Sequence, residues 1–390
     1  MQKTFYTGID IGTYHVKVVL AAPPERHDVP MQILGTGTAP SKGMRHGYVV
    51  DVREAAQSVR EAVERAASAA RLKVSSARLA IGGMGLEDLR STGDISLTPS
   101  GGVVSEADLD RAVKDSEKRA SAKLANKHVL HPIPLEYRID GMPIFGSPVG
   151  LQGTKLSVDV LLITILAKHY EDMVDAVEAA GIEVEGVMAS PLAASFVTLT
   201  KAQRMAGVVL ANIGSETLST IVYDNDTPVS IKVFPMGGTM ITESVALAFQ
   251  MPLPEAEQLK RGAVSGSDIP ERKLQTVVQG RMKDMFTMIA AHLKTIGKHR
   301  LLPAGIVMTG GGSGIASAAD LAKTILRLPS QVGQIGMLPR SASVDATWAV
   351  AYGLCRWGFT EASAHEGSSF GDVLRSGWKS LKSSLSSFLP

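Results

Sequence analysis

Two turns of small and hydroxylated residues are the first candidates for chemistry. The first lies in Thr7 to Leu20, TGIDIGTYHVKVVL, where apolar runs flank Gly12 and Thr13. This pattern predicts a β-hairpin. Gly12 has no Cβ to keep a ligand from the backbone, Thr13 offers N–H and hydroxyl donors, and Asp10 supplies a carboxylate for Mg²⁺. The turn therefore suits a phosphate group, although a plain structural hairpin has the same pattern.

A second stretch repeats this arrangement later in the chain. Gly207 to Tyr223, GVVLANIGSETLSTIVY, reads as an apolar strand, a polar turn and a second strand. The candidate ligand-binding residues here are Asn212, Gly214, Ser215, Glu216 and Thr217. Two such hairpins predict a duplicated fold that binds a nucleotide between its halves.

Three further pieces complete the candidate nucleotide site. Gly237 and Gly238 precede a predicted helix, whose N-terminal amides favour an anion. Glu257 and Lys260 lie one helical turn apart and could both reach a nucleoside, although an ordinary surface ion pair has the same spacing. After the apolar strand that starts at Ile306 come three consecutive glycines, which let the backbone lie against a flat ring or a phosphate. These are Gly310, Gly311 and Gly312.

Composition limits the classes of protein that need consideration. The chain has 390 residues, 45% of them hydrophobic, so two to four globular units are expected. A formal charge of +2 argues against a surface that binds nucleic acid over the whole protein. The single cysteine, Cys355, excludes an intrachain disulfide and is expected in the core. The first residues lack the apolar region of a signal peptide, and no long apolar run could span a bilayer, so we expect a protein kept inside the cell.

Periodicity predicts α/β elements that would position these residues. The first part reads as strands, a helix capped by Asp51 and another strand, and it is expected to resume after residue 164. Residues 84–164 include a long polar stretch and are expected to form an inserted α+β subdomain, because a structureless loop of that length is uncommon. The expected strands are 31–38, 78–82, 128–134, 135–139, 156–166, 182–187 and 229–234, and the expected helices are 52–71, 106–125, 169–180, 268–299 and 315–326.

The end of the chain carries an amphipathic pattern after a polar linker at 361–369. Residues 370–390 place large apolar side chains at three- and four-residue intervals, with cations outside that stripe. Such a helix is typical of one that lies in an anionic membrane surface; docking on the chain's own domain is the alternative. The apolar residues are Phe370, Leu374, Trp378, Leu381, Leu385 and Phe388, and the cations are Arg375, Lys379 and Lys382.

The order of these motifs resembles the superfamily that contains actin, the heat-shock chaperone ATPases and the sugar kinases. The motifs are GIDIGT, GVVLANIGSET, the E-x-x-K of Glu257 and Lys260, IVMTGGGSG and SVDATWAVAYGL. Within that superfamily, KGMRHGYVVD, the insertion and the tail resemble the FtsA family of bacterial cell-division proteins. The resemblance implies a two-lobed actin-like α/β fold that binds ATP and Mg²⁺ in a central cleft, with Asp10 at the metal.

The resemblance also implies a division of the chain into parts. We expect a first lobe with an inserted subdomain, a second lobe with an upper subdomain, and the linker and tail described above. The corresponding ranges are 1–83 with 165–205 and 340–360 for the first lobe, 84–164 for the insertion, 206–250 with 303–339 for the second lobe, and 251–302 for its upper subdomain.

The partners are likewise those that the resemblance implies. Proteins of this family form filaments, bind the C-terminal tail of the tubulin-like FtsZ and attach it to the cytoplasmic face of the anionic inner membrane at the division site. The inserted subdomain would bind other division proteins. The FtsZ tail is expected on the upper subdomain, where the cations Arg281, Arg272 and Lys273 could pair with its acidic residues.

The chain departs from the family in its second phosphate motif, usually D-I-G-G-G-T-T-D. It has Asn212 for the first Asp, Ser215 and Glu216 for two glycines, and Ser219 for the last Asp. An amide binds Mg²⁺ less strongly than a carboxylate and cannot act as a base, so at most weak ATPase activity is expected. A type IV pilus assembly ATP-binding protein, and an ATPase or kinase of the same fold, are the alternatives.

Overall fold

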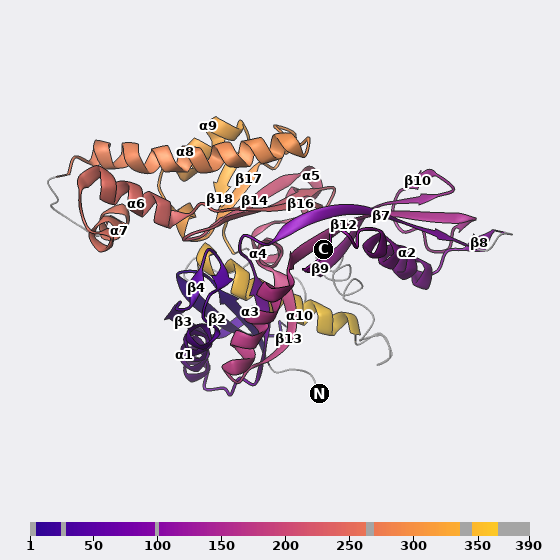
Figure 1. The fold of residues 1–390 in the computed structure, drawn as a ribbon, viewed down its shortest axis with the longest axis horizontal. Coiled ribbons are helices and arrows are strands. Elements are labelled where there is room, and N and C mark those ends of the chain that lie inside the picture. Colours follow the sequence, from indigo (N-terminus) through magenta and orange to yellow (C-terminus); the bar gives the residue numbers. More distant parts are fainter. Residues whose placement is uncertain (1–4, 25–28, 98–100, 263–268, 336–344, 366–390) are drawn as a thin grey trace.

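The structure, a computed structural model, describes residues 5–24, 29–97, 101–262, 269–335 and 345–365. Its first lobe is built on a five-stranded sheet with strand order β13-β6-β1-β2-β3 (Figure 1). The central strand β1 runs antiparallel to β2 and parallel to β6. These strands are β1 (Tyr6–Ile11), β2 (His15–Ala22), β3 (Gln32–Pro40), β6 (Ser76–Ile81) and β13 (Glu183–Ala189).

The second lobe repeats this sheet. Five strands of a nine-stranded sheet follow the order β16-β15-β14-β17-β18. Here β14 is antiparallel to β15 and parallel to β17, as β1 is to β2 and β6. The duplicated fold predicted from the two hairpins is therefore confirmed. The strands are β14 (Val208–Ile213), β15 (Leu218–Asp224), β16 (Thr227–Phe234), β17 (Ile306–Thr309) and β18 (Ser330–Val332).

The inserted segment is an α+β unit, as predicted, and its sheet continues that of the second lobe. The pairing of Glu87 with Lys232 joins β7 to β16, and helix α2 (Glu106–Arg119) packs on one face of the inserted strands. A separate pair, β8 (Gly102–Val103) and β11 (Gln152–Gly153), lies at its far end. The strands of the larger sheet are β7 (Glu87–Ser96), β9 (Lys127–Ile139), β10 (Met142–Ile144) and β12 (Lys155–Leu166).

Helices cover both faces of the first-lobe sheet. Because successive side chains of a strand point to opposite faces, alternate residues of each strand face different helices. A Cβ at Gly37 would lie 1.9 Å from the carbonyl oxygen of Ala62, so α1 (Val52–Ala70) packs directly on β3. The predicted cap is confirmed, because the Asp51 carboxylate accepts from the N–H groups of Arg53 and Glu54. The other helices of this lobe are α3 (Ala167–Ala179) and α4 (Ser190–Thr198), whereas α5 (Lys201–Ala206) contacts β15 of the second lobe.

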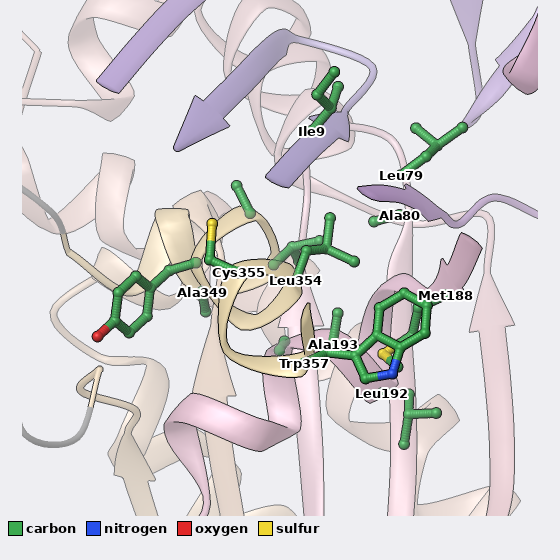
Figure 2. Packing of buried hydrophobic residues seen from close by; sticks show 14 of the residues in the cluster. Ile9, Leu79, Ala80, Met188, Leu192, Ala193, Ala349, Leu354, Cys355 and Trp357 are labelled. Carbon is green, nitrogen blue, oxygen red and sulfur yellow. The ribbon is translucent and has the colours of Figure 1, made fainter. Parts of the chain in front are cut away.

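Helix α10 (Ala349–His365) packs against β1 on the opposite face (Figure 2). A Cβ at Gly8 would lie 2.1 Å from the carbonyl oxygen of Ala351, and one at Gly353 would lie 2.0 Å from that of Ala193. Glycine at both positions therefore permits the close crossing of α10 with β1 and α4. The predicted core role of Cys355 is confirmed, since its thiol is fully buried and burial raises its pKa to about 12.

Four further helices and one helical turn cover the second lobe and line its side of the cleft. Helix α8 lies along the outside of the lobe next to α9. The predicted helix 268–299 is α8, and the one predicted from residue 315 starts later, after a 3-10 turn. The bounds are α6 (Gly238–Phe249), α7 (Leu253–Lys260), α8 (Glu271–Thr295), η1 (Gly311–Gly314) and α9 (Ala318–Leu326).

Several predicted boundaries were wrong. The strands expected at 128–134 and 135–139 are one strand, β9, and the helix expected to reach residue 125 ends at Arg119. Residues 361–365, expected as linker, continue α10. The expected tail helix at 370–390 lies outside the described residues. Within the described ranges, no helix has the length and apolarity needed to cross a bilayer.

Candidate nucleotide-binding cleft

A cavity of about 1620 Å³ lies between the two lobes, and both hairpin turns open into it. A volume of this size exceeds the roughly 300–1,000 Å³ of a typical small-molecule site. Most of the residues predicted to bind nucleotide line its wall. They are Asp10, Gly12, Thr13, Asn212, Gly214, Ser215, Thr217, Gly238, Glu257, Lys260, Gly310, Gly311 and Gly312.

The two turns have the same backbone arrangement. In the first, the N–H of Gly12 donates to the oxygen of His15 at 3.1 Å; in the second, the N–H of Gly214 donates to the oxygen of Thr217 at 2.9 Å. The strand registers also match, because Asp10 pairs with Lys17 where Asn212 pairs with Ser219. Each turn therefore presents equivalent small residues to the cavity, one from each lobe.

The glycine run after β17 packs tightly on the second hairpin. Gly310 has a φ of +80°, and a Cβ there would lie 2.3 Å from Asn212 Oδ1. A Cβ at Gly312 would lie 2.3 Å from Ile213 Cγ2, whereas one at Gly311 would meet nothing within 4 Å. The lack of a side chain at Gly310 and Gly312 thus lets the glycine run pack closely on the second hairpin. At Gly311 it leaves the backbone bare on the cavity wall.

Glu257 and Lys260 meet over the N-terminus of α6. Lys260 Nζ lies 2.6 Å from Glu257 Oε2 and donates to the oxygen of Gly238 at 3.1 Å and to Thr242 Oγ1 at 2.8 Å. The lysine side chain is 12% exposed, so this is not the ordinary surface pair that the spacing alone allowed. The network places one cation and one carboxylate beside the helix N-terminus within the cavity.

Lys17 is a wall residue that the sequence analysis did not select. Its Nζ donates to the carbonyl oxygen of Thr347 at 2.6 Å and lies 5.7 Å from the centre of the Trp348 ring. Burial lowers its pKa, while the charges of Asp10 and Asp345 oppose that shift. The period-two alternation of a hairpin offered a signal, since it places Asp10 and Lys17 opposite each other.

Two predicted residues are not part of the cavity wall. The N–H of His46 donates to Glu216 Oε2, so the Glu216 carboxylate is directed to the first lobe and not to the space expected for phosphate. Gly237 packs against the second turn, where a Cβ would lie 2.3 Å from the oxygen of Ser215. Because Gly237 has no side chain, its backbone can pack closely on the second turn, and the next residue, Gly238, lines the cavity.

The residues present fit a nucleotide with a divalent cation. Thr309 Oγ1 is a buried wall atom without a hydrogen-bond partner among the described residues, and the bare Gly311 backbone leaves room for a flat group. Among the described residues no group of three or more His, Cys, Asp or Glu side chains gathers. A cation at Asp10 would therefore depend on phosphate oxygens and waters, as Mg²⁺ commonly does.

Asp10 gives the cleft a measurable pH dependence. Desolvation raises its pKa from 3.8 to about 6, although Lys17 opposes the shift. Because the folded chain holds this proton more tightly, ionised Asp10 destabilises the fold, fully above pH 6 and progressively less toward pH 3.8. We expect Asp10→Asn to raise the free energy of unfolding of the ligand-free protein by about 1–3 kcal/mol at pH 8.

The gain in unfolding free energy from Asp10→Asn should be smaller at about pH 4.5, because Asp10 is then increasingly protonated in both the folded and the unfolded chain. Thermal denaturation of the parent and Asp10→Asn at the two pH values measures the difference. An equal gain at both would mean that burial of the carboxylate does not control its ionisation.

The cations predicted to bind the FtsZ tail lie on α8. Arg281 donates from Nε to Ser244 Oγ at 2.7 Å and lies 3.0 Å from Asp284 Oδ2, so it is held by α6 and by its own helix. Arg272 and Lys273 are exposed on the first turn of the helix. In the described part of the chain no ion pair involves either of these two.

Comparison with known proteins identifies the family. Residues 209–353 match the family model described as "Cell division protein FtsA", and residues 83–164 match "SHS2 domain inserted in FTSA". The cell division protein FtsA of Pseudomonas aeruginosa is 30% identical over 347 residues, covering 84% of this chain and 82% of that protein. FtsA of Borreliella burgdorferi is 25% identical, with 91% of each chain covered.

Solved structures extend the likeness to the fold alone. A structure of the PilM–PilN type IV pilus biogenesis complex matches with a TM-score of 0.68 and 18% identity, covering 91% of this chain and 98% of that one. MreB 5 of Spiroplasma citri, solved with AMPPNP bound, gives a TM-score of 0.53 at 11% identity, covering 94% and 99%. The fold is thus actin-like, as the resemblance implied, and the chain belongs to the FtsA family of cell division proteins.

Proposed function

We propose that this chain binds ATP with Mg²⁺ in the cleft, forms filaments on the cytoplasmic face of the membrane, and anchors FtsZ filaments there at the division site. The observation that carries the nucleotide part is the pair of equivalent turns facing one cavity. Membership of the FtsA family supports the part of the proposal that concerns filaments, the membrane and FtsZ.

The cleft residues divide the work of binding. Backbone N–H groups and hydroxyls at both turns would hold the phosphates, together with the buried cation of Lys17. Asp10 would orient the Mg²⁺ ion or its waters, and the ion would neutralise phosphate charge. On the nucleoside side, the bare backbone of Gly311 would offer a flat surface, and Glu257 and Lys260 line the same cavity.

Hydrolysis is expected to be slow. At the second turn, Asn212 and Ser219 stand where carboxylates would otherwise position a metal-bound water, and neither can act as a general base. We expect ATP turnover far below the roughly 10 per second that is the median for enzymes. Phosphate release measured with saturating Mg²⁺ and ATP tests this, and turnover near that median would mean that other residues perform the chemistry.

The FtsZ tail is proposed to bind the cations Arg272 and Lys273 at the start of α8, with Arg281 farther along the same helix. Charge reversal of Arg272, Lys273 and Arg281 to Glu would place acidic groups against an acidic peptide, so we expect affinity to fall at least tenfold, about 1.4 kcal/mol. Because Arg281 is held by Ser244 and Asp284, we expect the Arg272→Glu, Lys273→Glu pair to account for most of that loss.

Fluorescence anisotropy of a labelled FtsZ tail peptide measures the change. Lys73→Glu, an exposed charge reversal on the first lobe, is the control for a charge reversal outside α8. Equal affinity of the parent and the triple variant would mean that the FtsZ tail does not bind at these three residues.

The alternatives differ from this proposal in what they require. The pilus complex resembles the chain in fold at 18% identity, and a pilus role would not need the amphipathic tail at 370–390. A sugar-kinase role would need an additional catalytic Asp beside its substrate, and the sequence offers no strong candidate.

A further inference from the structure

The two hairpin turns each send one side chain across the cleft to the opposite lobe. From the second turn, Glu216 accepts a hydrogen bond from the N–H of His46 at 2.5 Å, and His46 Nδ1 lies 3.5 Å from the same carboxylate oxygen. His46 belongs to the first lobe, between β4 (Met44–Arg45) and β5 (Tyr48–Val49). One contact thus joins the lobes at the edge of the cavity.

From the first turn, Tyr14 makes the reciprocal contact. The guanidinium carbon of Arg261 lies 5.4 Å from the centre of the Tyr14 ring, a cation–π distance. Arg261 ends α7 in the second lobe, and its Nε lies 2.6 Å from Glu257 Oε1. The Tyr14 ring is therefore held by a cation that is itself fixed to the predicted nucleoside-binding residues.

These two residues occupy equivalent positions. In each hairpin four residues separate the last paired positions, which are Ile11 with Val16 and Ile213 with Leu218. Hydrogen bonds of Gly12 and Gly214 close the two segments, and Tyr14 and Glu216 are the third residues in them. The duplicated fold thus directs each third residue to the other lobe. Both contacts lie near the surface, because Tyr14 is 51% exposed and the His46 side chain 49% exposed.

The first-lobe partner of Glu216 is fixed in place. The N–H of Gly47 donates to Thr13 Oγ1 at 3.1 Å, and a Cβ at Gly47 would lie 2.5 Å from the Cα of Gly83. The loop that carries His46 is therefore packed against the first turn. Separation of the lobes must break the Glu216 contact, because this loop cannot follow the second lobe without losing its own packing.

We propose that Glu216 and Tyr14 form a two-point clamp that holds the lobes closed over a bound nucleotide and limits its release. This rests on the proposed binding of ATP in the cleft. The contacts of both clamp residues join the two lobes, and Glu216 is not part of the cavity wall, so the two act as positioning residues. Their loss should speed dissociation much more than it slows association.

Stopped-flow release of a methylanthraniloyl-labelled ATP, chased with excess unlabelled ATP, tests the clamp. We expect Glu216→Ala and Tyr14→Leu each to speed release at least fivefold, and the double variant at least 25-fold. Tyr14→Phe keeps the ring face that meets Arg261 but loses the hydroxyl that also interacts with it, so its release rate should fall between those of the parent and Tyr14→Leu. Glu64→Ala, which removes an exposed carboxylate from α1, is the control and should not change the rate.

A second measurement does not depend on nucleotide. Hydrogen exchange at the His46 amide of the ligand-free protein should be faster in Glu216→Ala than in Glu64→Ala, because the amide loses its acceptor. Failure of the parent to bind the labelled ATP would remove the proposed function itself. If the parent binds it but the clamp variants release it at the parent rate, or if exchange at His46 is unchanged, the clamp is wrong while the binding proposal stands.

Discussion

Gly311→Asp is expected to abolish ATP binding without unfolding the protein. A Cβ at this position meets nothing within 4 Å, so the new side chain finds room, but that room is the cleft. Its carboxylate would occupy space that the nucleotide needs and add negative charge to a cleft that must hold an anionic ligand. We expect the affinity measured by calorimetric titration with Mg²⁺ and ATP to fall at least 100-fold, about 2.7 kcal/mol.

A matched control is available on α8. A Cβ at Gly280 also meets nothing within 4 Å, and this residue does not line the cavity. Gly280→Asp adds the same charge to the same protein and should bind ATP as the parent does. If Gly311→Asp keeps near-parental affinity and its fold is intact by circular dichroism, ATP does not bind in this cleft.

Trp378→Glu is expected to release the protein from anionic vesicles. It places a charge in the middle of the predicted apolar stripe, where burying a large apolar side chain is worth roughly 1.5–3 kcal/mol. Each nearby cation adds about 1 kcal/mol, so one tail should bind modestly and a filament carrying many tails far more firmly. Vesicle co-sedimentation should therefore show at least a tenfold loss of bound protein.

Ser380→Glu is the control for this change, because it adds the same charge on the predicted polar side of the helix. It should weaken membrane binding only slightly, and both variants should bind ATP as the parent does. Retention of Trp378→Glu on vesicles would favour the alternative, in which the tail docks on its own domain.

The hairpins and the duplicated sheet were predictable because their signals are local. An apolar run, a short turn with glycine and a second apolar run specify a hairpin wherever they occur. The inserted strands were harder. Two strands were expected where β9 is continuous. Pro132 and Pro134 cannot donate to a neighbouring strand, yet β9 continues through both, and its pairing with β12 shifts register twice.

Strand β7 was missed because its sequence is polar. Its residues pair along their whole length with β12, which supplies the apolar core that β7 itself lacks. Gly93 permits the contact with α2, since a Cβ there would lie 1.8 Å from the oxygen of Ala112. This packing is a long-range property, so neither propensity nor periodicity could reveal it.

The cleft itself was only partly predictable. Glycines and hydroxyls at the turns marked its phosphate side, and the hairpin register could have added Lys17. The direction of Glu216 could not be predicted, because its partner His46 is separated from it by 170 positions and belongs to the other lobe. Contacts between lobes depend on how two folded units meet, which no local pattern encodes.

Flotation of FtsZ filaments with anionic vesicles tests the adaptor proposal most directly. With ATP and the parent protein present, FtsZ should float with the vesicles, and without the protein it should not. Trp378→Glu should leave both proteins in the dense fraction, whereas the triple variant of Arg272, Lys273 and Arg281 should itself float but leave FtsZ behind. A parent protein that floats without FtsZ, or FtsZ that floats equally with Trp378→Glu, would contradict the proposed function.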